Sequence, residues 1–181
     1  MMKSSKILLW YFSFSVLLVS FSYASDVIEQ TGNFIKVILP VTAIGLSLYK
    51  NDYEGLFQFT ESFLTTITIT YGLKYSIKTT RPNGEPHSFP SGHTSIAFSG
   101  ASFLQKRYGW KYGIPAYAAA AFIGYSRLEA NKHYFRDILA GAIIGTASSY
   151  LFTDVYSSNK MSFIPVVENK SFIMLFNLRF Y

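Results

Sequence analysis

The sequence predicts an all-α protein, a compact bundle of about five to six helices with a short β-hairpin at its C-terminal end. Three observations favour this fold class. Half of the 181 residues are hydrophobic and 14% are charged, which excludes a disordered chain and is below the roughly 25% typical of soluble domains. Apolar stretches of helical length recur along the chain, and residues 161–180 read as two short strands around a polar turn.

The chain begins with a candidate signal sequence. Lys3 and Lys6 precede an apolar run and a Ser-x-Ala sequence that ends at Ala24. This order is typical of a secretory signal, although the run is also close to the lower length limit of a membrane helix. Both interpretations place the following segment outside the cytoplasm. We assign residues 1–24 to a signal peptide or first membrane helix, 25–155 to a helical domain and 156–181 to a C-terminal tail.

Five apolar segments predict the helices of the central domain. They cover residues 34–49, 56–73, 94–104, 112–125 and 138–152. The last two are shorter than the ~20 residues that a full membrane span prefers. The sequence therefore leaves two alternatives open, a bundle that spans the membrane and a compact bundle that is soluble or only partly exposed to lipid.

The net charge of +6 narrows the class of partner. A basic chain can bind nucleic acid, anionic lipid or a phosphorylated substrate. Its basic residues are scattered and match no nucleic-acid-binding motif, so we expect no nucleic acid partner. The chain has no cysteine, which excludes disulfides, thiolate metal sites and a cysteine nucleophile.

The positions of the basic residues predict a membrane topology. Lys50 follows the segment at residues 34–49, and a second basic group lies between the segments that end at 104 and begin at 112. That group consists of Lys106, Arg107 and Lys111. Because cytoplasmic loops are enriched in Lys and Arg, residues 74–93 and 126–137 are expected to face the periplasm.

A basic cluster lies at the predicted end of the second segment. If the preceding helix continues, the spacing i, i+4 and i+7 places Lys74, Lys78 and Arg81 on one helix face before Pro82 ends the helix. Three like charges on one face repel each other unless an anion binds between them. The alternative is a solvated helix end, where cations interact favourably with the helix dipole.

A second cluster lies at the start of the third segment. Ser91 is a plausible N-cap, and Gly92 allows an anion to approach the free N–H groups of the first helical turn. His93 would stand beside that anion. The alternative is an ordinary capped helix start that happens to contain a histidine.

The third cluster joins the last two helices. Arg127 ends one apolar segment, and His133 and Asp137 follow with the i, i+4 spacing that brings a carboxylate within reach of an imidazole. A structural His–Asp pair is the alternative. Two of the three histidines lie in the second and third clusters, and all three clusters fall on the same predicted side, which favours one shared site.

The three clusters together resemble the type 2 phosphatidic acid phosphatase superfamily. The motifs are Lys-x6-Arg-Pro at residues 74–82, Pro-Ser-Gly-His at 90–93 and Ser-Arg-x5-His-x3-Asp at 126–137. All are complete and in the expected order, and the resemblance covers roughly residues 34–153. One departure is the short connection between the first two motifs, residues 83–89, which implies a small entrance loop.

The resemblance implies a role for each site residue. His133 would attack phosphorus to form a phosphohistidine, Asp137 would hold its other nitrogen, and His93 would protonate the leaving oxygen and then activate water. Lys78 and His87 are not family positions and are expected at the rim. No metal and no cofactor are expected, because cationic side chains take the metal's role. The implied phosphate-binding residues are Lys74, Arg81, Ser91, Gly92 and Arg127.

The function that the resemblance implies is that of a metal-independent phosphatase at the periplasmic face of a bacterial inner membrane. Its substrate would be a lipid phosphomonoester or pyrophosphate, such as phosphatidic acid, phosphatidylglycerol phosphate, undecaprenyl pyrophosphate or lipid A. The alternatives are a soluble periplasmic acid phosphatase, released by signal cleavage, and a vanadium-dependent haloperoxidase, which the small size argues against. The sequence predicts a lipid substrate and a membrane as partners. It does not indicate an oligomeric state.

Overall fold

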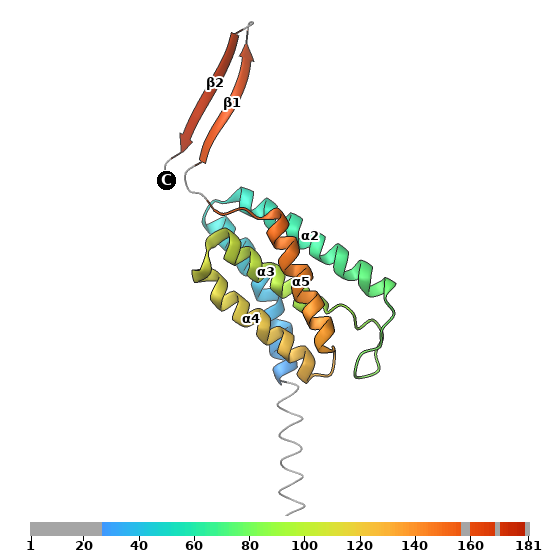
Figure 1. Ribbon diagram of the computed structural model, residues 1–181. Coiled ribbons are helices and arrows are strands. Elements are labelled where there is room, and N and C mark those ends of the chain that lie inside the picture. Colours follow the sequence, from blue (N-terminus) through green and yellow to red (C-terminus); the bar gives the residue numbers. More distant parts are fainter. Residues whose placement is uncertain (1–26, 157–159, 169–170, 180–181) are drawn as a thin grey trace, which may run out of the picture.

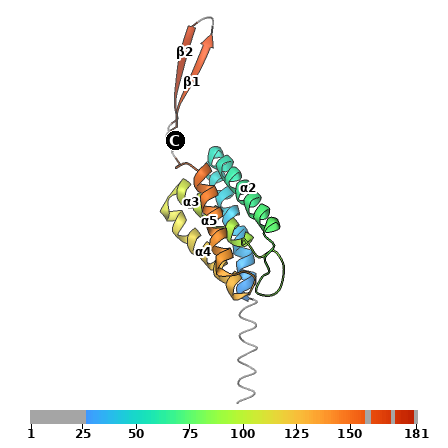
Figure 2. The same ribbon diagram turned by 45° about the vertical axis from the view of Figure 1, so that its right-hand side comes forward.

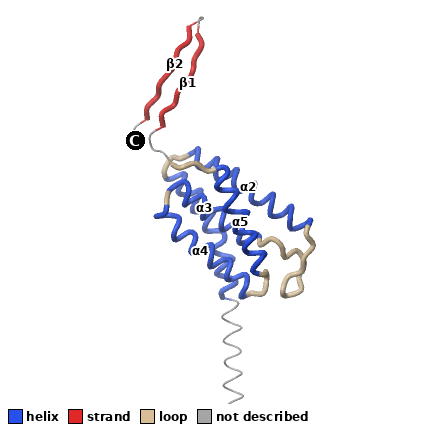
Figure 3. The backbone as a smooth tube through the Cα atoms, viewed as in Figure 1, coloured by secondary structure: helices blue, strands red, loops and turns tan. Residues whose placement is uncertain are grey.

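The structure, a computed structural model, describes residues 27–156, 160–168 and 171–179. In these ranges it confirms the predicted helical bundle and the predicted hairpin (Figures 1 and 3). The candidate signal sequence at residues 1–24 lies outside the described residues. The first helix is described over Val27–Tyr49. The others are α2 (Tyr53–Ser76), α3 (Gly92–Tyr108), α4 (Trp110–Glu129) and α5 (Phe135–Phe152). The strands β1 (Lys160–Glu168) and β2 (Ser171–Arg179) pair antiparallel.

Local sequence signals set the helix boundaries. The Asp52 carboxylate accepts the backbone N–H of Gly55 and caps the start of α2. Ser91 caps α3, as its position before the apolar segment predicts. Gly109, with a φ of 88°, separates α3 from α4, since a residue without a Cβ adopts this backbone conformation without strain.

Small residues form the centre of the bundle. Helix α3 packs against α2, α4 and α5, and fully buried alanines such as Ala97, Ala101 and Ala120 lie at these contacts. Phe59 and Phe103 supply bulk, with ring centroids 4.9 Å apart. Small side chains let the helix backbones approach closely, as in many helix pairs inside membranes.

Large apolar side chains lie on the outside of the bundle. Phe34, Ile143 and Leu151 are 68%, 60% and 76% exposed, whereas many serines and threonines are buried. This distribution is the reverse of a water-soluble core and is typical of a surface that meets lipid. Among the described helices, the one at Val27–Tyr49 is long and apolar enough to span a membrane by length and composition.

The bundle has two chemically distinct ends. The loops at residues 77–91 and 130–134 lie together at one end, where α2 and α4 finish and α3 and α5 begin (Figures 1 and 2). The turns before α2 and between α3 and α4 lie at the opposite end. The three sequence clusters all fall at the first end, which we call the loop end.

Candidate active site

A cavity of about 320 Å³ opens at the loop end. It is lined by five of the residues that the sequence predicts for the site: Lys74, Arg81, Gly92, His93 and His133. Ser91, Arg127 and Asp137 are buried behind this lining. Helix α2 ends at Ser76, so Lys78 and Arg81 lie in the loop after it and the predicted helix face with Lys74 does not form. Lys78 is exposed, and His87 contributes to the cavity wall. The fold therefore gathers residues from three separate motifs around one hollow.

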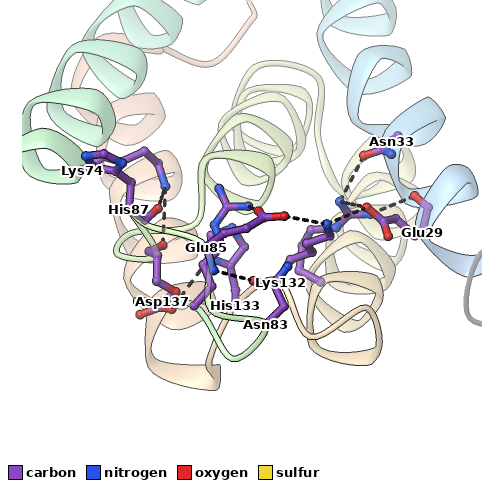
Figure 4. A network of polar contacts seen from close by, with 12 residues as sticks. Glu29, Asn33, Lys74, Asn83, Glu85, His87, Lys132, His133 and Asp137 are labelled. Atoms are coloured by element: carbon purple, nitrogen blue, oxygen red, sulfur yellow. Dashed lines mark hydrogen bonds and ion pairs between the residues drawn. The ribbon is translucent and has the colours of Figure 1, made fainter. Parts of the chain in front are cut away.

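Lys74 projects from the last turn of α2 into the cavity. Its side chain is 8% exposed, and Nζ donates a hydrogen bond to the carbonyl oxygen of His87 at 2.8 Å (Figure 4). The Ser88 carbonyl oxygen lies 3.5 Å from the same nitrogen. An ammonium group has three donors, so one donor remains for an anion. The helix thus delivers a fixed positive charge, and the loop carbonyl orients it.

Arg81 lies just after α2, in the loop that forms the rim. Its Nη1 pairs with the Glu85 carboxylate at 2.6 Å, and its backbone N–H donates to the carbonyl of Glu85. Lys132 approaches the same carboxylate at 3.4 Å from the α4–α5 loop (Figure 4). The Nε of Arg81 is buried and has no hydrogen-bond partner. This guanidinium therefore retains a free donor in the site.

The start of α3 forms the floor of the cavity. Ser91 is fully buried, and its hydroxyl contacts the backbone N–H and the hydroxyl of Thr94. A Cβ at Gly92 would meet one neighbouring atom, Thr70 Cγ2, at 3.9 Å. The backbone at Gly92 is therefore open toward the cavity, and a helix N-terminus favours an anion at this point.

His93 contacts the first helix through Asn33. The Asn33 Oδ1 lies 2.9 Å from His93 Nε2, and it accepts a second hydrogen bond from Arg127 Nη1 at 3.1 Å. Because an arginine can only donate, Asn33 presents its oxygen here, and His93 Nε2 must carry the proton that the oxygen accepts. The network therefore places a proton on His93 Nε2.

His133 is 4% exposed in the connection between α4 and α5, where its backbone N–H donates to the carbonyl of Arg127. Burial lowers the pKa of His133 to about 4, helped by the nearby charges of Lys74 and Arg81 and opposed by Asp137. The imidazole is therefore neutral at pH 7. A neutral imidazole has the lone pair that a nucleophile requires.

Asp137 is fully buried and connects two of the motifs. Its Oδ2 accepts hydrogen bonds from the Ser88 hydroxyl at 2.5 Å and from the Tyr134 backbone N–H at 3.0 Å. The Nδ1 of His133 lies 3.7 Å from the same oxygen, beyond hydrogen-bonding distance. In this structure Asp137 acts on His133 as a neighbouring charge, and its direct side-chain partner is Ser88.

The sequence motifs do not identify four residues that complete the site. Ser88 holds Asp137, and the first helix contributes Glu29, Asn33 and Lys36. The Glu29 carbonyl accepts a hydrogen bond from Arg127 Nη2 at 2.8 Å. Glu29, Asn33 and Lys36 have the spacing i, i+4 and i+7, which places them on one face of a largely apolar helix. This pattern is the sequence signal that could have identified them.

The arrangement suits an anion with several oxygens. Four buried side-chain nitrogen or oxygen atoms in the described residues lack a hydrogen-bond partner, and three of them belong to Arg81, His133 and Asp137. Unpaired buried polar atoms are rare and call for an explanation. Among the described residues, no group of three or more His, Asp or Glu side chains could hold a metal ion. The cations of Lys74 and Arg81, with the N–H groups at the start of α3, can bind a phosphate group.

Comparisons with known proteins agree with this chemistry. Residues 55–161 match the PAP2 superfamily. The chain is 31% identical to a lipid A 4'-phosphatase of Helicobacter pylori over 79% of its own length and 78% of the relative. It is 29% identical to an undecaprenyl-diphosphatase of Sulfolobus acidocaldarius, over 67% and 65% of the two chains. The structure resembles a transmembrane PAP2-type phosphatidylglycerolphosphate phosphatase of Bacillus subtilis, with a TM-score of 0.57, 25% identity, and 72% and 73% of the two chains covered.

Proposed function

Because this chain belongs to the PAP2 superfamily, we propose that it is a membrane-bound lipid phosphatase that hydrolyses a phosphomonoester or pyrophosphate group through a phosphohistidine. One observation carries the proposal. A buried neutral imidazole, His133, lines the same cavity as the cations of Lys74 and Arg81. A nucleophile beside fixed positive charges is the arrangement that phosphoryl transfer requires.

In the first step, His133 attacks the phosphorus atom and the bond to the leaving oxygen breaks. Negative charge on the phosphoryl oxygens is stabilised by Lys74, by Arg81 and by the N–H groups at the start of α3. Arg127 supports the site from behind the lining, through its contacts with Asn33 and the Glu29 carbonyl. Asp137 lies 3.7 Å from the His133 ring and stabilises the positive charge that develops on it.

His93 completes the reaction as the acid and then the base. To act as the acid, His93 must be the imidazolium, a form that a phosphate dianion bound beside the ring favours. It gives one proton to the leaving oxygen and becomes the neutral imidazole. In the second step it removes a proton from water, which attacks the phosphohistidine and releases inorganic phosphate. The sum of the two steps is hydrolysis, and both histidines return to their starting state.

The proposed location is the bacterial inner membrane, with the loop end facing the periplasm. The exposed apolar side chains support a membrane location. Lys50, Lys106 and Lys111 lie at the opposite end of the bundle, where the positive-inside rule places the cytoplasm. A cysteine placed at Asn83 in this cysteine-free chain should react with an impermeant maleimide in intact spheroplasts. Reaction only after lysis would place the site in the cytoplasm.

Phosphate release from a panel of substrates tests the activity. The panel contains phosphatidic acid, phosphatidylglycerol phosphate, undecaprenyl pyrophosphate, lipid A and the soluble aryl ester para-nitrophenyl phosphate. The proposal expects the purified protein in detergent to favour at least one lipid over the aryl ester in kcat/KM. Equal or faster turnover of the aryl ester, together with extraction of the protein without detergent, would support a soluble acid phosphatase instead.

A further inference from the structure

Lys36 is a cation of the cavity that no motif contains. It is the single charged residue between Phe34 and Tyr49, and its side chain lines the cavity beside His93. Its Nζ lies 3.4 Å from His93 Nε2. The proton on that nitrogen already points to Asn33, so the ring offers no lone pair to the ammonium at this position.

The charge of Lys36 is not balanced by a carboxylate. In the described residues the carboxylates at the loop end that form ion pairs are Glu29, Glu85 and Asp137, and none of them pairs with Lys36. A partly buried ammonium without a counter-ion is unfavourable. The position becomes favourable when a bound anion supplies the missing charge.

The position of Lys36 identifies which part of a substrate it would meet. The attacking and leaving atoms lie roughly in line across the phosphorus. His133 occupies the attacking side in the proposed function, and His93 occupies the leaving side. A leaving oxygen that replaces Asn33 as the hydrogen-bond partner of His93 Nε2 lies about 3 Å from that nitrogen. Lys36 Nζ, 3.4 Å from the same nitrogen, then reaches groups attached to the leaving oxygen.

We propose that Lys36 forms a second anion subsite, which binds the phosphate on the leaving side of a lipid diphosphate. This inference rests on the proposed function and names its substrate class. The cavity lining also includes the exposed rings of Tyr71 and Tyr75 and the half-buried Ile96, which offer an apolar and aromatic surface to the lipid. The site therefore prefers a lipid diphosphate to the monophosphate of the same lipid.

The chemistry of the leaving group agrees with this preference. His133 attacks the terminal phosphorus, the bridging P–O bond breaks, and a lipid monophosphate departs with the electron pair. Water then releases inorganic phosphate from His133. The second pKa of a phosphate monoester is about 6, so this leaving group departs as an anion near neutral pH. An alkoxide leaving group must instead take a proton and departs as a neutral alcohol. It then carries no negative charge that the Lys36 ammonium could stabilise.

A matched pair of lipids tests the subsite. Farnesyl diphosphate and farnesyl monophosphate differ in one phosphate, and kcat/KM is measured for both. Lys36→Gln should lower the value for the diphosphate about 10- to 100-fold, the usual effect of one charged hydrogen bond, and change the monophosphate value less than about threefold. Lys36→Arg should keep most of the preference. Lys78→Gln is the matched control, because it removes an exposed lysine outside the cavity lining.

Direct binding separates this inference from the proposed function. Calorimetry on the His133→Ala protein, with and without Lys36→Gln, measures the affinity for both lipids without turnover. Loss of affinity for the diphosphate alone supports the subsite. Equal losses for both lipids, or no loss, overturn it. If the wild type hydrolyses no lipid, the proposed function fails, and the binding comparison still decides the role of Lys36.

Discussion

Each end of the bundle buries one arginine, but the two arginines have different kinds of partner. At the end opposite the site, Arg107 is 2% exposed and forms two hydrogen bonds to the Asp52 carboxylate, with Nε–Oδ2 at 2.7 Å and Nη2–Oδ1 at 2.5 Å. Gln58 and the carbonyl of Asp154 accept from Nη1. At the loop end, Arg127 is 3% exposed, and its close partners are an amide oxygen and a backbone carbonyl.

This difference separates a structural arginine from a functional one. The positive charge of Arg107 is balanced by the buried carboxylate of Asp52, so this arginine needs no ligand as a counter-ion. Arg127 has a carboxylate at a distance, with Glu29 Oε1 3.8 Å from Nη1. Arg81 likewise pairs with a half-exposed glutamate and keeps a free Nε. The loop end therefore carries positive charge that a substrate must balance, and the predictions below test this contrast.

The largest expected effect is that of His133→Ala, which removes the proposed nucleophile at the loop end. We expect phosphate release to fall about 10⁴-fold or more, while the thermal unfolding midpoint stays near that of the wild type. The wild type should trap an acid-labile, base-stable phosphate from labelled substrate, and the variant should not. Label that persists in the variant would show that another residue attacks.

Exchanging the two arginines for glutamine tests the contrast directly. Arg127→Gln should lower kcat/KM about 10²- to 10³-fold, because it loosens the charged site, with little loss of stability. Arg107→Gln should destabilise the fold by about 3–5 kcal/mol, because Asp52 is left buried without its cation. Its folded fraction should keep most of the activity. The free energy of unfolding in detergent and kcat/KM for phosphate release are measured on the same samples. If the two variants lose stability and activity to the same extent, the two arginines do not differ in role.

The two ends should also differ in how pH affects stability. His133 has a folded pKa of about 4, below the ordinary value of about 6.5, so the unfolded chain binds more protons between these values. This end therefore loses stability as the pH falls from about 6.5 to 4. Burial raises the pKa of Asp52, but its hydrogen bonds from Arg107, Gly55 and Tyr108 outweigh burial and lower it overall. The opposite end should lose stability only below about pH 4.

Unfolding midpoints measured from pH 7 to pH 3 test this order of events. In His133→Gln one of the two site imidazoles is absent, so the loss between pH 6.5 and 4 should shrink without disappearing, while the loss at lower pH remains. An unchanged profile would assign the first loss to another group.

The smallest expected effect is that of a chelator. EDTA should change the rate less than about twofold, because the charges that stabilise the phosphoryl group come from side chains. Orthovanadate, which mimics phosphate, should inhibit competitively. A rate that falls in EDTA and returns with magnesium would contradict the mechanism and would place a metal at the loop end.

Apolar segments and caps made the helices predictable from the sequence. The segment ends at residues 73 and 152 lie within three residues of the ends of α2 and α5, and Ser91 begins α3 as its cap chemistry predicts. Long apolar runs and capping residues are local signals, so they do not depend on the rest of the fold. The motif residues were also predictable as a group, because three spaced clusters identified one family.

The contacts between distant segments could not be predicted from these signals. The expected partner of His133 was Asp137, but the path of the loop at residues 77–91 brings Ser88 to that carboxylate instead. Asn33 and Lys36 reach the site because the first helix packs beside α3, and no motif records that packing. Such residues depend on tertiary geometry, which a pattern along one chain does not contain.

The close packing of α3 on α5 has a consequence for how such an enzyme can diversify. A methyl group at Gly141 would lie 2.5 Å from the Ser91 carbonyl oxygen, and one at Gly145 would collide with that of Ser95. Backbone rests on backbone at this seam, so the start of α3 is held against α5 at a distance that only small residues permit. New substrates can therefore be accommodated by changing the first helix and the rim loop, while the reacting atoms keep their separation.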